Sequence, residues 1–171
     1  MLDLGCGAGR FCAVARAAGA RAIGVDVAEA ALERARANVP GGDFRLSAVD
    51  GPLPLGDGEV GLVWASEVLA HVADTAALLS ELRRVLRPGG RLLVTTPDHG
   101  PARRTLGALH GFERVHDPLG PRLRFYTRRS LRETLAGFGF EPVRMGALGG
   151  LPGLRASLVA DAVREPLRVL R

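Results

Sequence analysis

Three glycines at alternate positions near the start of the chain have the spacing that points most directly to chemistry. Gly5, Gly7 and Gly9 follow a short apolar run, and an alanine-rich helical pattern begins directly after them. Glycine lets the backbone turn tightly and lie close to a ligand. The helix behind such a turn directs its N–H groups towards that ligand. The spacing differs from the dinucleotide fingerprint Gly-x-Gly-x-x-Gly, in which the third glycine comes one residue later.

Carboxylates occupy positions from which they can serve the same ligand. Asp3 precedes the first glycine by two residues, and Asp26 and Asp50 each follow a short apolar run. An ionised carboxylate accepts hydrogen bonds and can bind two neighbouring hydroxyl groups at once. Aspartate is also common in turns, so each of these residues taken alone is equally compatible with a turn. Their joint placement with the glycine turn favours a ligand site.

The elements that must position these residues alternate between strand and helix patterns. Besides the apolar run before the glycines, we expect strands at 21–25, 44–49, 60–64, 91–95, 140–144 and 155–160, the last two around a loop at 146–153. We expect helices at 9–18, at 29–38, and from a cap at Asp74 to the break at Pro88. A further helix begins near Thr127 or Ser130, since both can cap it.

This alternation predicts an α/β fold. The sheet is Rossmann-like and doubly wound, mostly parallel with a C-terminal antiparallel hairpin, and helices cover both faces. Ligands of such sheets bind outside the carboxyl ends of the strands. The glycine turn, Asp26, Asp50, Ser66 and Glu67 all lie at predicted strand ends.

Length and composition favour a single domain over residues 1–171, with 98–124 as an insertion that covers the substrate. All 23 basic residues are arginines and the net charge is +5. We interpret the arginine-rich stretch 122–132 as a solvated helix face rather than a site for an anionic group or RNA, so no nucleic-acid partner is expected. The sequence has no apolar stretch of about 20 residues. Cys6 and Cys12 have neither metal-binding nor disulfide spacing, which favours a reduced, cytoplasmic protein.

Several segments together resemble one family. Residues 2–10, LDLGCGAGR, resemble motif I of the class I S-adenosylmethionine (SAM)-dependent methyltransferases. Residues 82–93, LRRVLRPGGRLL, are similar to the Arg-Val-Leu-Arg-Pro-Gly-Gly stretch of the type 11 methyltransferases, and segments 45–55, 67–72 and 124–140 also resemble that family. The resemblance implies the class I methyltransferase fold and SAM as cofactor.

The resemblance also implies a role for individual residues. The glycine turn, including Cys6, would hold the methionine part of SAM, and Asp3 its amino group. Asp26 would bind the ribose hydroxyls and Val27 would pack on the adenine. Asp50 would accept a hydrogen bond from the adenine amino group, Gly51 would face the ring, and Ser66 would lie under the sulfonium. A buried acid at Asp3 and an ordinary strand-end serine at Ser66 stay open as alternatives.

The implied reaction is an in-line displacement at the sulfonium methyl, in which the protein mainly aligns the nucleophile and excludes water. His71 is the candidate general base, with a core or helix-end histidine as the alternative. His99, His110 and His116 lie in the insertion, and each is first interpreted as a surface histidine. Some relatives bind a metal through Glu-x-x-Glu-His. Ala70 stands where the second glutamate would be, so no metal is predicted.

The resemblance begins inside the first strand, with Met1 where relatives have valine. We therefore expect either an internal GTG codon taken as the start or a truncated gene. The predicted activity is methyl transfer from SAM to an O, N or C nucleophile of a small acceptor, such as a quinone, a lipid, a glycan precursor or another metabolite. A non-catalytic SAM-binding domain and an NAD(P)-dependent oxidoreductase are the alternatives.

Overall fold

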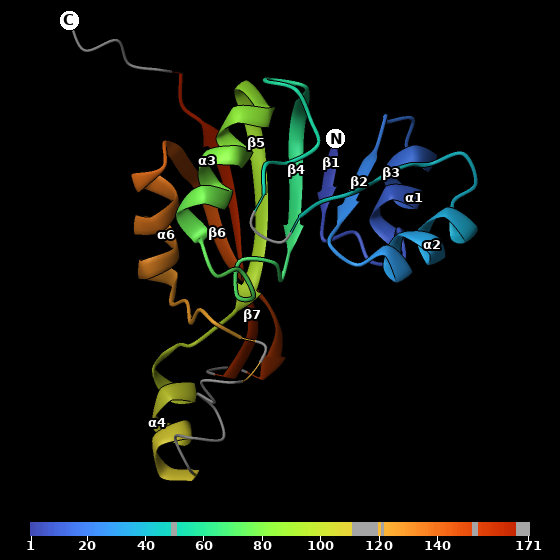
Figure 1. Ribbon diagram of the computed structural model, residues 1–171. Helices are drawn as coiled ribbons and strands as arrows, with labels where there is room; N and C mark the ends of the chain where they lie inside the picture. Colours follow the sequence, from blue (N-terminus) through green and yellow to red (C-terminus); the bar gives the residue numbers. More distant parts are fainter. Residues whose placement is uncertain (49–50, 111–119, 121, 152–153, 167–171) are drawn as a thin grey trace, which may run out of the picture.

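A twisted sheet of seven strands organises the described part of the chain in the computed structural model (Figure 1). The structure describes residues 1–48, 51–110, 120, 122–151 and 154–166. The strands are β1 (Leu2–Leu4), β2 (Ile23–Asp26), β3 (Asp43–Leu46), β4 (Val60–Ser66), β5 (Leu86–Pro97), β6 (Phe140–Leu151) and β7 (Leu154–Arg164).

The strand order is β3-β2-β1-β4-β5-β7-β6. The first five strands in this order are parallel, and β7 is antiparallel to both β5 and β6. The central strand β1 aligns Leu4 with Val25 of β2 and with Ala65 of β4, so these three strands end at one edge of the sheet. The predicted mostly parallel sheet with a C-terminal antiparallel hairpin is confirmed.

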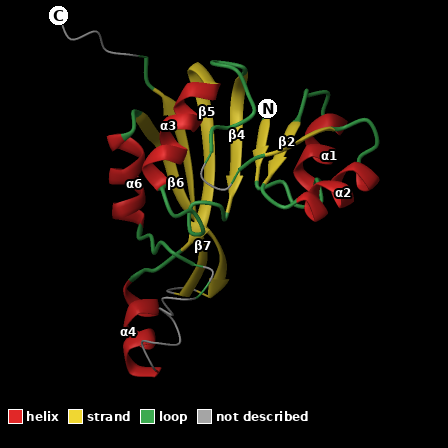
Figure 2. Cartoon of the chain, viewed as in Figure 1, coloured by secondary structure: helices red, strands yellow, loops and turns green. Residues whose placement is uncertain are grey.

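The helices are α1 (Arg10–Ala17), α2 (Glu29–Asn38), α3 (Thr75–Val85), α4 (Pro101–His110) and α6 (Arg128–Gly137). Figure 2 shows α1 and α2 beside β1 and β2, whereas α3 and α6 lie in front of the β4–β7 half of the sheet. Helix α4 follows the carboxyl end of β5 and extends beyond the sheet (Figure 1). It occupies part of the predicted insertion at 98–124.

Side-chain caps fix where two of these helices begin. The Asp74 carboxylate accepts a hydrogen bond from the Ala77 N–H at 2.8 Å, which confirms the predicted cap of α3. For α6 the structure selects Thr127 over Ser130. The Thr127 hydroxyl accepts from the Ser130 N–H, and the Ser130 hydroxyl accepts from the Thr127 N–H, so the two form a reciprocal capping box.

Several strand boundaries differ from the sequence prediction. Strand β3 ends at Leu46 rather than at residue 49, because its partner β2 ends at Asp26. Strand β5 begins at Leu86, directly after α3. The loop predicted at 146–153 is wrong for the described residues of that stretch, since pairing of β6 with β7 continues to Leu151 and Leu154.

Apolar side chains form two clusters. The larger one lies between the sheet and helices α3 and α6, and includes Phe140, which is fully buried. The smaller one lies beneath the glycine turn and helices α1 and α2. It consists of Cys6, Cys12, Ala22, Leu32, Ala35, Val39 and Phe44.

Candidate active site

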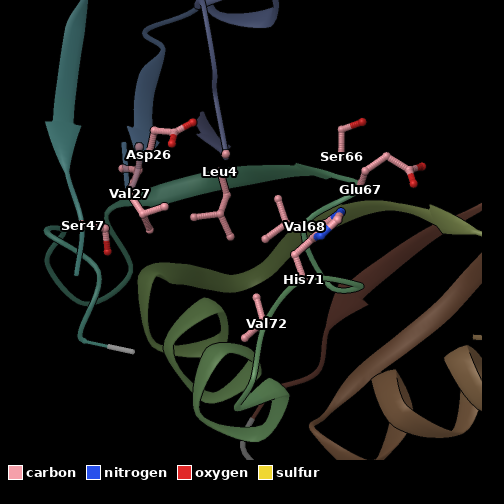
Figure 3. Close-up of a pocket in the computed structure, with 11 residues that line it drawn as sticks. Leu4, Asp26, Val27, Ser47, Ser66, Glu67, Val68, His71 and Val72 are labelled. Carbon is pink, nitrogen blue, oxygen red and sulfur yellow. The ribbon is translucent and has the colours of Figure 1, made fainter. Parts of the chain in front are cut away.

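A cavity of about 390 Å³ lies where β1, β2 and β4 end, at the edge of the sheet where the sequence predicts a ligand. Its volume is within the range of small-molecule sites. It is lined by Leu4, Gly5, Val25, Asp26, Val27, Ser47, Ser66, Glu67, Val68, His71 and Val72. Figure 3 shows Asp26, Val27 and Ser47 on one side of Leu4, with Ser66, Glu67 and His71 on the other.

A second hollow of about 240 Å³ adjoins this cavity. It shares Leu4, Val27, Val68 and Val72 with the first and adds Gly51, Pro52, Asp74, Ala77, Leu78 and Glu81. Of the predicted site residues, Gly5, Asp26, Val27, Ser66 and His71 line the first cavity, and Gly51 lines the second. Asp50 lies outside the described residues.

The glycine turn has the backbone conformation that its sequence predicts. Gly5, Gly7 and Gly9 have φ angles of 69°, 53° and 78°. A Cβ at Gly5 would lie 2.8 Å from Val68 Cγ2, whereas a Cβ at Gly7 would meet no atom within 4 Å. Side chains are therefore excluded at Gly5 by packing as well as by φ. At Gly7 the backbone is open to close approach by a ligand.

Asp26 is fixed to the glycine turn by two hydrogen bonds. Its Oδ2 accepts from the Gly7 N–H at 2.8 Å, and its Oδ1 accepts from the Ala28 N–H at 3.0 Å. Each carboxylate oxygen has about two lone pairs, so each can accept one further hydrogen bond from a ligand. The carboxylate thus lines the cavity in a set orientation before any ligand binds.

Asp3 lies behind the turn rather than in the cavity lining. It is 1% exposed, and its Oδ2 accepts a hydrogen bond from the Cys12 thiol at 3.4 Å. Burial raises the pKa of Asp3 to about 6, and the nearby Asp26 charge adds to that rise. This placement corresponds to the buried acid that the sequence left open.

Both cysteines are free and buried in the smaller cluster. Burial raises the pKa of Cys6 to about 12, and it also raises the pKa of the Cys12 thiol. Both thiols are therefore neutral at physiological pH. The Cys6 N–H donates to the Val25 carbonyl at 3.1 Å, so Cys6 joins the turn to β2.

The end of β4 carries the other polar side chains of the cavity. Ser66 Oγ lies 3.0 Å from Thr95 Oγ1 of the neighbouring strand β5. Glu67 has a φ of 60° and is also bonded to Thr95. His71 is exposed on the loop between β4 and α3, and its backbone N–H donates to the Val68 carbonyl.

Sequence reasoning assigned no role to five cavity residues: Leu4, Val25, Ser47, Val68 and Val72. It placed Glu67 at a strand end but gave it no role in the site. Ser47 comes directly after the last residue of β3, so the strand-end rule could have found it had β3 been bounded correctly. The expectation of a surface histidine at His99 is wrong. Its side chain is 4% exposed, with Nδ1 3.2 Å from the Pro97 carbonyl oxygen, and its ring meets Phe125 edge-on. His116 and the His110 side chain lie outside the described part of the chain.

Within the part of the chain that the structure describes, no group of three His, Cys, Asp or Glu side chains is arranged to hold a metal ion. Among the described helices, none is long and apolar enough to cross a membrane.

Comparison with known proteins agrees with the fold. A family model described as "Methyltransferase domain" matches residues 2–94, which include β1 to β4, the glycine turn and all residues that line the two hollows. The chain belongs to this methyltransferase family. The cofactor of the family is SAM, as the sequence resemblance implied.

Curated relatives of this methyltransferase domain are longer than the chain. It is 36% identical to a probable S-adenosylmethionine-dependent methyltransferase of Mycolicibacterium smegmatis, over 82% of the chain and 51% of the relative. It is 37% identical to a malonyl-[acyl-carrier protein] O-methyltransferase of Methylococcus capsulatus, over 86% of the chain and 54% of that protein. The chain thus spans about half the length of these two relatives.

Solved structures show the same fold at lower identity. A SAM-dependent methyltransferase from Mesorhizobium loti superposes with a TM-score of 0.74 at 24% identity, over 95% of this chain and 89% of that one. The Haloferax volcanii complex of the Trm112 methyltransferase activator with a methyltransferase gives a TM-score of 0.78 at 20% identity, over 96% and 82%. These likenesses bear on the fold alone.

Proposed function

We propose that this domain transfers the sulfonium methyl group of SAM to an O, N or C nucleophile of a small-molecule acceptor. The observation that carries the proposal is the division of the cavity. A carboxylate fixed to the glycine turn lies on one side of Leu4, and the polar end of β4 lies on the other (Figure 3). One side suits the cofactor's sugar and the other suits an acceptor.

The residues present fit SAM. Asp26 would accept hydrogen bonds from the ribose hydroxyls with the lone pairs that its two backbone partners leave. Val27 is 54% exposed and joins the two hollows, so it offers an apolar surface to a flat base such as adenine. Gly51 lies in the second hollow, on the side where the base would extend. The glycine turn, with open space over Gly7, would admit the methionine part.

SAM supplies an activated methyl group whose leaving group is neutral, so the protein needs to align the acceptor and exclude water. Leu4, Val68 and Val72 give the cavity an apolar wall, from which a bound ligand would displace water. His71 lines the cavity beside the polar end of β4, where it would accept a proton from a hydroxyl or ammonium acceptor. One relative is an O-methyltransferase named for ubiquinone biosynthesis, which supports an acceptor of small-molecule type.

The test is calorimetric titration of S-adenosylhomocysteine (SAH), the demethylated product of SAM, into the wild type and Asp26→Ala. We expect the variant to bind SAH about tenfold or more weakly, because it loses a charge-assisted hydrogen bond to the ribose. Asp57→Ala is the matched control, since the Asp57 carboxylate is exposed and pairs with Arg84 on the surface.

Equal SAH binding by wild type and Asp26→Ala would contradict the cofactor assignment. Wild type that binds NAD but not SAH would favour the oxidoreductase alternative instead. Circular dichroism and melting temperature would show whether Asp26→Ala keeps its fold, since Asp26 also holds Gly7.

A further inference from the structure

Glu67 has an unusual backbone conformation at the end of β4. Its φ is 60°, and among the residues that the structure describes it is the only one besides glycines with a positive φ. In this region the Cβ of any residue other than glycine lies too close to the backbone, which costs about 1–2 kcal/mol. Such strain persists where the surrounding structure holds it in place, and it clusters at functional sites. Glycine would take this conformation freely, so the position keeps glutamate at a cost in stability.

Thr95 holds Glu67 in this conformation. The Glu67 N–H donates to the Thr95 carbonyl at 2.9 Å and to Thr95 Oγ1 at 3.1 Å. The Thr95 hydroxyl donates its one hydrogen to Glu67 Oε1 at 3.0 Å. Its remaining lone pair can accept from Ser66 Oγ, 3.0 Å away. Thr95 is 5% exposed, so these bonds are shielded from water and set the orientation of the carboxylate.

The second carboxylate oxygen of Glu67 is left for a ligand. Within the described part of the chain, Glu67 forms no ion pair and Oε2 accepts no hydrogen bond. The side chain lines the cavity together with the apolar Leu4, Val68 and Val72 (Figure 3). When a ligand displaces water from such a wall, the carboxylate oxygen loses its hydrogen bonds to water, which costs free energy. A hydrogen-bond donor on the ligand would offset that cost.

We infer that Glu67 binds the methyl acceptor, and that the acceptor carries a hydroxyl or amine group which donates a hydrogen bond to Oε2. This inference rests on the proposed function and narrows its acceptor class. A carboxylate at the same place would face Glu67 as a like charge, so carboxylate acceptors are disfavoured. Thr95 is the positioning residue, because it touches Glu67 and not the acceptor.

The test measures binding of three small aromatic probes to the domain saturated with SAH: catechol, benzylamine and benzoate. Calorimetry or ligand-observed NMR gives each dissociation constant. We expect catechol or benzylamine to bind at least about tenfold more tightly than benzoate, because a hydrogen bond to a charged group is worth about that much in affinity. In Glu67→Gln this preference should shrink by about tenfold while SAH binding stays unchanged.

Two variants separate binding from a structural role. Glu141→Gln is the matched control, because it removes the same charge from an exposed position on β6. Glu67→Gly relieves the positive φ, so it should melt at the same or a higher temperature and bind SAH normally, yet lose the probe preference.

Several outcomes overturn the inference. These are binding of benzoate as tight as that of the other probes, no binding of catechol or benzylamine to the SAH complex, or an unchanged preference in Glu67→Gln and Glu67→Gly. Failure of the wild type to bind SAH at all is a different result, since it contradicts the proposed function itself.

Discussion

Asp3 shows how a single buried carboxyl links the cofactor turn to pH. Its pKa is about 6 in the folded protein and 3.8 in an unfolded chain, and burial is the main cause. The folded state therefore holds the proton more tightly. Stability from this group is fully present below about pH 4 and is lost as pH rises through about 6. The loss corresponds to roughly 3 kcal/mol, at 1.36 kcal/mol per pKa unit.

Asp3→Asn should remove this dependence. Urea denaturation at pH 4, 5, 6 and 7 would give the unfolding free energy of both proteins. The difference between them isolates Asp3, because acids whose pKa is lowered, such as Asp43 and Glu81, contribute the opposite slope to both. Parallel curves for wild type and variant would show that Asp3 keeps an ordinary pKa.

The start of α3 offers a prediction at the scale of an element. The Asp74 carboxylate caps this helix by accepting a hydrogen bond from the Ala77 N–H. Asp74 also lines the second hollow. Asp74→Ala leaves that donor without its partner and should lower the unfolding free energy by about 1 kcal/mol. Asp74→Asn keeps a cap and should cost much less. A urea midpoint that falls equally in both variants would mean that the cap is not the cause.

Elements were predictable from the sequence where local chemistry decides them. The alternating pattern gave the parallel strands in the right places, and Asp74 marked a helix start. Boundaries failed where a neighbouring strand decides them. β3 stops at Leu46 because β2 offers no further partner, and β6 continues through Gly146 and Gly149 because β7 pairs with it. Thr127 competed with Ser130 as a cap, and both proved to belong to one capping box.

The candidate site was partly predictable for the same reason. Gly5 and Asp26 carry recognisable signals, a positive-φ residue type and a strand-end carboxylate, and both line the cavity. Glu67 is also a strand-end carboxylate, but no local signal predicts its positive φ. Its conformation depends on Thr95, which lies 28 residues further along the chain and meets it only through the pairing of β4 with β5.

At the scale of the whole molecule, the cofactor side of the cavity depends on the smaller of the two apolar clusters. Phe44 is the large side chain of that cluster. It packs where a Cβ on Gly9 would lie 3.0 Å from its ring and a Cβ on Gly24 only 2.6 Å. The glycine turn therefore sits directly on this ring. Phe140 belongs to the larger cluster, packed with α3 and α6 on the other half of the sheet.

Phe44→Leu and Phe140→Leu therefore form a matched pair. Each removes similar buried volume and should lower the unfolding free energy by about 1–2 kcal/mol. Only Phe44→Leu leaves a gap beneath the glycine turn, so it alone should weaken SAH binding. The expected loss of affinity is about tenfold, which corresponds to about 1.4 kcal/mol of binding free energy. Urea denaturation and calorimetric titration on the same samples give both quantities. Equal loss of SAH affinity in the two variants would mean that the clusters are coupled through the sheet, whereas no loss in either would mean that the turn holds its shape without the ring.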